Sequence, residues 1–338
     1  MDKPLLTIAI PTYNRAKFLE LSIKQLKKDA SLIDDNTIEV MIYDDCSTDN
    51  TDDVVREAII KGMKINHIKN KKNLGLDGNV AKCINEAKGK YIIVLGDDDL
   101  FIDGAIKWLV NLLKQKDYGV VCMKAYGYER DHNAEFPGRQ GKEKEFTNFS
   151  DFLISIGPLV TFTSACVFNK EILGKFDAKK NCGSWLVHVP LILTSAIKAR
   201  INLYSTRYHI AAKRNNSGGY DFIKVFVKNL GVFLDALKKK GVSEETILRF
   251  DRKMMINYLP FYLLRQRVRR VNQAENIIIL KNRYIKSMYL WFWLLPIASL
   301  PRPLAIPYGC LTTAIGRILN GDILRAIYLL KNKIYLNR

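Results

Sequence analysis

The stretch LLTIAIPTYNRAKFLELSIKQLKK (residues 5–28) sets the pattern that decides the fold. A short apolar run ends in a polar loop, and a segment whose apolar residues have helical spacing follows it. The same order recurs after IEVMIY, KINHIK and YIIVLG, which begin at residues 38, 64 and 91. Strands that alternate with amphipathic helices form βαβ units, so we expect an α/β fold with a mostly parallel sheet and helices on both faces. Ligands of such sheets bind beyond the carboxyl ends of the strands.

The composition of the 338 residues excludes several classes of protein. With 48% apolar and 26% charged residues the chain can bury a core, which argues against a disordered, collagen-like or disulfide-scaffold protein. The six cysteines are too far apart for a zinc module or a disulfide framework, and MDKPLLTIAIPTYNR lacks the apolar stretch of a signal peptide. We therefore expect a cytoplasmic protein with reduced thiols.

The net charge of +19 indicates an anionic partner, and most of it lies near the C-terminus. Residues 251–338 hold 15 Lys and Arg against three acids, a local +12, which leaves +7 for residues 1–250. The apolar run MYLWFWLLPIASL (288–300) lies in the same basic quarter and is too short to span a bilayer. Aromatic residues flanked by Arg and Lys favour an anchor on an anionic membrane surface, while core helices or an oligomer interface remain the alternative. No nucleic-acid-binding module is found, so nucleic acid is not expected as a partner.

Three adjacent carboxylates, Asp97, Asp98 and Asp99, follow the run YIIVLG directly. They repel one another unless a cation neutralises them. Carboxylate oxygens suit Mg²⁺ or Mn²⁺, which usually bind through one or two carboxylates together with substrate phosphates. The triplet therefore predicts a metal-diphosphate site; the alternative is an acidic helix N-terminus.

A second acidic pair, Asp44-Asp45, ends the run IEVMIY. A turn with a helix cap at Ser47 or Asp49 explains the residues that follow but not the pair itself. A buried carboxylate there is suited to accept a hydrogen bond from a nucleotide base. Thr12 would lie alongside as a hydroxyl contact and Arg15 as a cation near phosphate, although an ordinary surface role for Arg15 stays open.

The segment from Lys71 to Asn79 is suited to contact a nucleotide sugar ring. It offers Lys72, Asn73, Gly75 and Asp77, and Lys72 is alternatively only solvated. The chain has no GxxxxGK[ST] and no GxGxxG after its first strand, which excludes a P-loop and the usual dinucleotide fold. A nucleotide is therefore expected to be held by acids and a metal.

Taken together, PTYNRAKFLELSIKQL (11–26), VMIYDDCSTDNTDDVV (40–55) and NKKNLGLDGNVAKCINEAKGKYIIVLGDDDL (70–100) resemble glycosyltransferase family two, which has the GT-A fold. The likeness covers residues 5–125 and continues more weakly to 220. LGDDDL and TFTSACVFNK (161–170) are similar to the abequosyltransferase-like branch of O-antigen and capsule sugar transferases.

The resemblance implies that Thr12 and Asp44 or Asp45 bind the base and ribose. It makes Asp97 and Asp99 the outer acids of the family's D-x-D motif, with Asp99 the metal ligand to expect first. The full set of predicted donor-binding residues is Pro11, Thr12, Tyr13, Arg15, Asp44, Asp45, Lys72, Asn73, Gly75, Asp77, Asp97, Asp98 and Arg214.

The chain departs from the family where inverting members carry a Glu-Asp pair with the general base. FDAKKNCGSWLVHVPLILTSAIKA (176–199) has no such pair, and the apolar rhythm of the helix places His188 at that position. A neutral imidazole can accept a proton from an acceptor hydroxyl, and Asp177 is the reserve candidate. A packed histidine beside Trp185 is the alternative, and inversion against retention stays open.

The segment 204–220 corresponds to the place where family members put a metal-binding His or a basic residue over the diphosphate. The candidates are His209 as a metal ligand, with Arg214 and Ser217. A hairpin with a basic loop is the alternative.

These observations predict a GT-A domain over residues 1–220, with a nucleotide-binding half (1–125) and an acceptor half (126–220), followed by a helical, basic region over 221–338. The expected activity is metal-dependent transfer of a sugar from a UDP- or CDP-sugar to a glycan or polyprenyl-linked acceptor, at the inner face of the cell membrane. A homo-oligomer stays open, as do two other functions: a nucleotide-sugar-binding protein without transferase activity, and a nucleotidyltransferase.

Overall fold

A computed structural model describes residues 3–30, 36–138, 140–214 and 219–319. The chain divides into two compact units, residues 1–216 and 217–338. The sequence predicted the boundary four residues later, at 220. Each unit is described by itself below.

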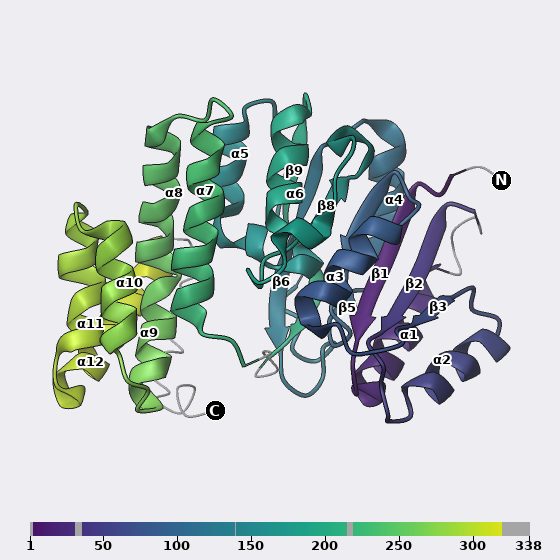
Figure 1. Cartoon of the computed structure of the whole chain (residues 1–338), viewed down its shortest axis with the longest axis horizontal. Coiled ribbons are helices and arrows are strands. Elements are labelled where there is room, and N and C mark those ends of the chain that lie inside the picture. The colour runs from purple at the N-terminus through teal and green to yellow at the C-terminus, as the bar shows by residue number, and fades with distance from the viewer. Residues whose placement is uncertain (1–2, 31–35, 139, 215–218, 320–338) are drawn as a thin grey trace. The chain divides into compact units, whose positions relative to one another are not determined.

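The first unit is built on one sheet with the strand order β3-β2-β1-β4-β8-β6-β9-β5, and β7 pairs with β9 (Figure 1). Its strands are β1 (Leu6–Thr12), β2 (Ile38–Asp44), β3 (Asn66–Lys69), β4 (Tyr91–Val94), β5 (Leu100–Phe101), β6 (Val120–Tyr128), β7 (Glu143–Phe146), β8 (Cys166–Asn169) and β9 (Asn202–Lys213). Its helices are α1 (Ala16–Ala30), α2 (Thr51–Ile60), α3 (Gly75–Glu86), α4 (Ala105–Gln115), α5 (Phe149–Ile156) and α6 (Val189–Lys198), with 3₁₀ helices η1 (Gly157–Thr161), η2 (Thr163–Ala165), η3 (Glu171–Leu173) and η4 (Ala178–Asn181).

Strand β1 shows how side-chain alternation builds the two layers of helices. Leu6, Ile8 and Ile10 are fully buried in a cluster with apolar residues of α1, α2 and α4. Successive side chains of a strand point to opposite faces, so Ala9 lies on the other face, where α3 packs against β1. A strand buried on both faces needs this nearly continuous apolar sequence.

The α/β fold class predicted from the sequence is confirmed, and the pairing of the strands changes halfway across the sheet. Strands β3, β2, β1 and β4 are parallel neighbours. Strand β8 then runs antiparallel to both β4 and β6, and β9 is antiparallel to β5 and β7 but parallel to β6. The first four strands therefore bring the ends of β1, β2 and β4 to one edge, as expected.

The second unit is helical in its described part. Its elements are the π-helical turn η5 (Lys224–Asn229), α7 (Leu230–Lys238), α8 (Glu244–Asn257), α9 (Leu259–Val268), α10 (Ala274–Tyr284), the π-helical turn η6 (Leu290–Leu294), α11 (Leu295–Ser299) and α12 (Arg302–Leu319). Helix α12 packs closely against α8 at Gly316. A Cβ atom at this position would lie 2.2 Å from the Ile256 carbonyl oxygen, so only glycine fits there. Within the described residues, no helix has both the length and the apolar content that a membrane span requires.

Candidate active site

The loops after β1, β2 and β4 meet at one edge of the sheet, and hydrogen bonds join them. The Thr12 hydroxyl donates to Asp97 Oδ2 over 2.8 Å, which links β1 to β4. The Asn14 backbone N–H donates to Ser47 Oγ over 2.8 Å, and the Thr48 N–H donates to Asn14 Oδ1, which links β1 to β2. Thr12 at the end of β1 and Asp97 of the aspartate triplet, 85 positions apart in the chain, are thus direct hydrogen-bond partners.

Arg15 pairs with the aspartate triplet. Its Nε lies 3.1 Å from Asp97 Oδ1, and its terminal nitrogen lies 2.7 Å from Asp98 Oδ2. The sequence left a surface role open for this residue, and the geometry instead places its positive charge on two of the three carboxylates. One guanidinium does not balance three ionised carboxylates, so ionisation of the whole triplet requires a further cation.

Asp99 is buried, and hydrogen bonds from two other segments hold its carboxylate. Its Oδ2 accepts a hydrogen bond of 2.5 Å from Ser164 Oγ, and its Oδ1 accepts one of 3.3 Å from the Lys213 backbone N–H. Ser164 Oγ in turn accepts from the Gly96 N–H. The carboxylate is therefore positioned by residues from β9 and from the segment that precedes β8.

Burial changes the acidity of two members of the triplet. Desolvation raises the pKa of Asp97 to about 7, although Arg15 lowers it in part. Desolvation and then the negative charge of Asp98 raise the pKa of Asp99 to about 8. A cation in the site would favour the ionised forms of both, so these carboxyls are poised to bind one.

These shifts predict a pH dependence of stability. In the unfolded chain both carboxyls lose their protons near pH 4, whereas in the folded state they keep them until about pH 7 to 8. The folded state therefore binds more protons over this range, and its stability falls as pH rises toward 8. His188 and His209, whose pKa values are lowered to about 4 by burial, act in the opposite direction below about pH 6.5. Between about pH 6.5 and 8, without divalent cations, we expect a loss of about 1–2 kcal/mol, seen as a lower midpoint of thermal unfolding. An unchanged midpoint across this range would contradict the buried carboxyls.

The donor set fits a hard divalent cation. Asp97 and Asp99 offer carboxylate oxygens, which Mg²⁺ and Mn²⁺ prefer, and both are buried with raised pKa values. Such ions commonly take one or two protein carboxylates and complete their shell with phosphate oxygens and water. A dedicated cluster of three protein ligands is therefore not required here.

In the described part of the chain, Asp44, Asp52 and His67 are the one set of three potential metal ligands that lie within 4.8 Å of one another. Lys69 already supplies the cation: its Nζ bonds to Asp52 and lies 3.7 Å from Asp44 Oδ2. We interpret this set as an ion-pair network that places a positive charge beside buried Asp44, not as a metal centre.

The acidic pair at the end of β2 divides into two roles. Asp44 Oδ1 accepts from the Ser47 N–H, while its Oδ2 is buried without a hydrogen-bond partner. Asp45 Oδ1 accepts from Asn70 Nδ2 and from the Leu74 N–H, both over 2.8 Å. Asp45 thus anchors the loop between β3 and α3, and Asp44 keeps an oxygen for a ligand.

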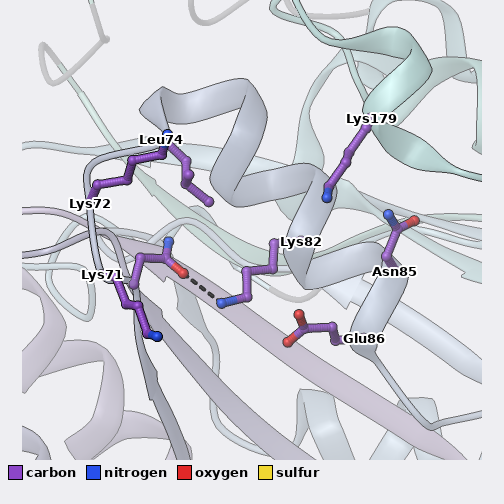
Figure 2. A pocket seen from close by; sticks show the side chains of 8 residues that line it. Lys71, Lys72, Leu74, Lys82, Asn85, Glu86 and Lys179 are labelled. Carbon is purple, nitrogen blue, oxygen red and sulfur yellow. Dashed lines mark hydrogen bonds between the residues drawn. The ribbon is translucent and has the colours of Figure 1, made fainter.

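The loop after β3 and the start of α3 carry three more of the predicted donor-binding residues, Lys72, Asn73 and Gly75. Asn73 Oδ1 accepts from the Gly75 N–H, and Gly75 has a positive φ of 72°, which a residue with a side chain would adopt only with strain. Lys72 lines a cavity of about 370 Å³. Figure 2 shows Lys71 and Lys72 on the loop side of this cavity, Lys82 on α3, and Lys179 directed inward from η4. The surroundings of Lys72 are strongly basic.

Pro11 and Tyr13 flank Thr12 at the end of β1. Pro11 is partly buried, and its position pairs with Tyr43 of β2. The Tyr13 side chain is exposed, so its ring is available to a ligand at this edge.

His209 and Arg214 lie on or just beyond β9. His209 Nε2 is 2.8 Å from Ser205 Oγ, and its ring stacks on Trp108 with centroids 3.8 Å apart. Its Nε2 therefore already has a partner within β9. Arg214 lies 3.9 Å from Glu135 and packs over Gly127. Ser217 lies outside the described residues.

The two candidate bases are placed differently. His188 is the residue before α6, buried, with Nε2 donating to the Thr161 carbonyl oxygen over 3.1 Å. Asp177 caps η4, and its Oδ1 accepts from Asn85 Nδ2, a bond that lowers its pKa. Asp77, on α3, contacts the segment between η4 and α6: its Oδ2 accepts hydrogen bonds from the backbone N–H groups of Gly183 and Trp185.

The burial of His188 favours a packing role, and a variant separates this role from catalysis. We expect His188→Ala to lower the free energy of unfolding by about 1–3 kcal/mol, since it leaves the Thr161 carbonyl unpaired. The kcat of the folded variant should fall by less than about tenfold. A fall of about a hundredfold or more with an unchanged unfolding midpoint would instead establish the predicted base.

The edge where β1, β2 and β4 end, with its loops of acids, is where the sequence resemblance predicts a nucleotide-sugar site in a GT-A fold. The family model of Glycosyl transferase family 2 matches residues 7–176, half of the chain, and the chain belongs to this family.

Curated relatives agree with this membership, and a solved structure shares the fold. The chain is 27% identical over 153 residues to a Campylobacter jejuni GalNAc(5)-diNAcBac-PP-undecaprenol beta-1,3-glucosyltransferase, covering 45% of this chain and 48% of that one. It is 29% identical over 286 residues to the uncharacterized glycosyltransferase MG025 of Mycoplasma genitalium, covering 77% and 92%. The fold is similar to that of Staphylococcus aureus TarS residues 1–349 in complex with UDP-GlcNAc, with a TM-score of 0.55, 15% identity and coverage of 94% and 92%. The chain spans about half the length of several of its curated relatives.

Proposed function

We propose that the protein transfers a sugar from a nucleoside-diphosphate sugar to a hydroxyl group, with a divalent cation at Asp97 and Asp99. The observation that carries the proposal is the pair of buried carboxyls with raised pKa values that follows β4, of which Asp97 accepts a hydrogen bond from Thr12 at the end of β1. A bound Mg²⁺ or Mn²⁺ would neutralise the charge that develops on the departing diphosphate.

The chain's own residues supply the rest of the donor site. Asp44 offers Oδ2, which accepts no hydrogen bond in the structure, to a base N–H, and the exposed Tyr13 ring offers a face for stacking. Arg15 is near enough to the triplet to exchange a carboxylate for a phosphate oxygen once a cation is bound. We favour a UDP-sugar as the donor, and the TarS complex with UDP-GlcNAc supports this choice. A CDP-sugar is the second choice.

For the acceptor we propose a glycan or polyprenyl-linked glycan at the cytoplasmic face of the cell membrane. The Campylobacter relative, by its name, acts on an undecaprenol-linked glycan, which supports this choice. The base that activates the acceptor hydroxyl stays a prediction between His188 and Asp177.

A donor panel tests the proposal. UDP-, CDP-, GDP- and dTDP-sugars are incubated with the full chain, with Mn²⁺ or with a chelator, and release of nucleoside diphosphate is measured. We expect turnover with donors of a single nucleotide, with UDP-sugars as the first expectation. The chelator should abolish this turnover. Metal-dependent binding without turnover of any donor, even with lipid-linked acceptors, would favour a binding protein. Consumption of added inorganic diphosphate, with formation of a nucleoside triphosphate and a sugar 1-phosphate, would indicate a nucleotidyltransferase.

A further inference from the structure

Exposed apolar side chains gather at one place in the second unit. The described residues carry nineteen large apolar side chains that are exposed, and eight of them lie within residues 285–319. Among these, Met288 is 64% exposed and Phe292 69%. We call the following set the aromatic patch: Met288, Trp291, Phe292, Leu304 and Leu311.

Secondary structure and one hydrogen bond place the patch on a single surface. Leu304 and Leu311 are seven residues apart on α12, so they share one face of the helix, and Tyr308 lies between them on that face. The Tyr308 hydroxyl donates to the carbonyl oxygen of Phe292 in η6. Helix α11 packs against both η6 and α12, and Figure 1 shows these C-terminal helices side by side. The two segments that carry the patch are therefore neighbours in the second unit.

Positive charge flanks the patch along the chain, and acids are absent from that stretch of the sequence. Residues 276–321 contain five Lys and Arg and no Asp or Glu. Exposed Lys286 lies two residues from Met288. At the other end, Arg302 donates to the carbonyl oxygens of Arg267 and Val268, which brings the exposed Arg269 close to the start of α12.

We propose that the aromatic patch docks on the surface of a membrane that contains anionic lipid. Aromatic and aliphatic side chains would enter the interface, while Lys286 and Arg269 would contact lipid phosphates. A second copy of the chain fits less well, because pairing two patches would bring Lys286 and Arg269 of one copy toward the same cations of the other. The proposal extends the proposed function, since a lipid-linked acceptor lies at a membrane, but docking itself requires no turnover.

The test is flotation of the full chain with vesicles of phosphatidylcholine, alone or with roughly 30% phosphatidylglycerol. We expect the wild-type protein to float with the anionic vesicles and to detach as salt is raised. Met288→Ser/Phe292→Ser should reduce the partition coefficient by about tenfold or more, because both exposed side chains lose apolar area. Lys286→Gln/Arg269→Gln should reduce it by a similar factor.

Ile60→Ser is the matched control, since Ile60 is 77% exposed but lies on α2 of the first unit. It should float like the wild-type protein. The proposal is overturned if Met288→Ser/Phe292→Ser keeps wild-type flotation, if neutral vesicles bind equally well, or if the wild-type protein stays off vesicles as a dimer that the variant dissociates.

Two further measurements keep docking separate from folding and from catalysis. The unfolding midpoint of each variant should match that of the wild-type protein; if Met288→Ser/Phe292→Ser is unstable, the charge variant and the salt series decide alone. Release of nucleoside diphosphate without vesicles should be the same in wild type and variants, so a failed donor panel leaves the docking result intact.

Discussion

Replacement of Asp99 by asparagine is expected to lower the kcat of sugar transfer by about a thousandfold or more, because it removes a carboxylate ligand of the proposed cation. The same change should raise the unfolding midpoint of the metal-free protein at pH 8. Asp99 is buried, and the charge of Asp98 raises its pKa further, so its ionised form costs stability that a neutral amide does not. Activity and stability should therefore change in opposite directions.

Asp103→Asn is the matched control for this experiment. Asp103 lies four residues further on and is also paired, with Lys28 and Gln25, but it is outside the triplet. We expect its kcat to stay within about threefold of the wild-type value, since surface pairs of this kind contribute little. If Asp99→Asn kept more than about a tenth of wild-type turnover with Mn²⁺ present, the cation would have to be held elsewhere.

The first half of the sheet and the acids at its edge could be predicted from the sequence because they depend on local patterns. Strands such as LTIAIPT are buried on both faces and read as apolar runs, and a polar loop follows each. Parallel strands bring such loops to one edge whatever the details of packing. Thr12 and Asp97 were therefore predicted to share a site before any distance was known.

The second half of the sheet depends on pairing between distant residues. Strand β8 has only four residues, CVFN, and 3₁₀ turns precede it. Its sequence therefore does not indicate whether the strand pairs parallel or antiparallel to its neighbours. Its antiparallel place between β4 and β6 follows from tertiary contacts. The partners of Asp99 were missed for the same reason, because Ser164 and Lys213 lie 65 and 114 residues away in the chain.

The candidate base shows the limit of helical rhythm as a guide. The rhythm placed His188 at the start of a helix, and the structure has it immediately before α6. Rhythm does not report burial, however, and burial lowers the pKa of His188 to about 4. A weak base at that position is a finding that only packing could supply.

Replacement of Asp45 by alanine is the second change for which we expect a large effect. Asp45 is buried, and its Oδ1 accepts from Asn70 Nδ2 and the Leu74 N–H. Asn70 also receives a hydrogen bond from Lys82 at its Oδ1, so one carboxylate holds the loop, and the loop in turn holds a lysine of the basic cavity. Without the acceptor, the Leu74 N–H loses its partner and Asn70 Nδ2 keeps only Asn79 Oδ1, so we expect a loss of about 2–4 kcal/mol in the free energy of unfolding.

The donor site should weaken with the loop. The residues from Lys72 to Gly75 depend on this anchor, so the KM for the nucleotide sugar should rise by about tenfold or more, while kcat at saturation falls less. Asp45→Asn separates geometry from charge, because its carbonyl oxygen can still accept both hydrogen bonds. We expect this variant to recover most of the stability and to show an intermediate KM. Thermal unfolding and initial-rate kinetics on the two variants decide: an alanine variant with wild-type stability and KM would mean that the loop after β3 is held by other contacts and that Asp45 does not organise the donor site.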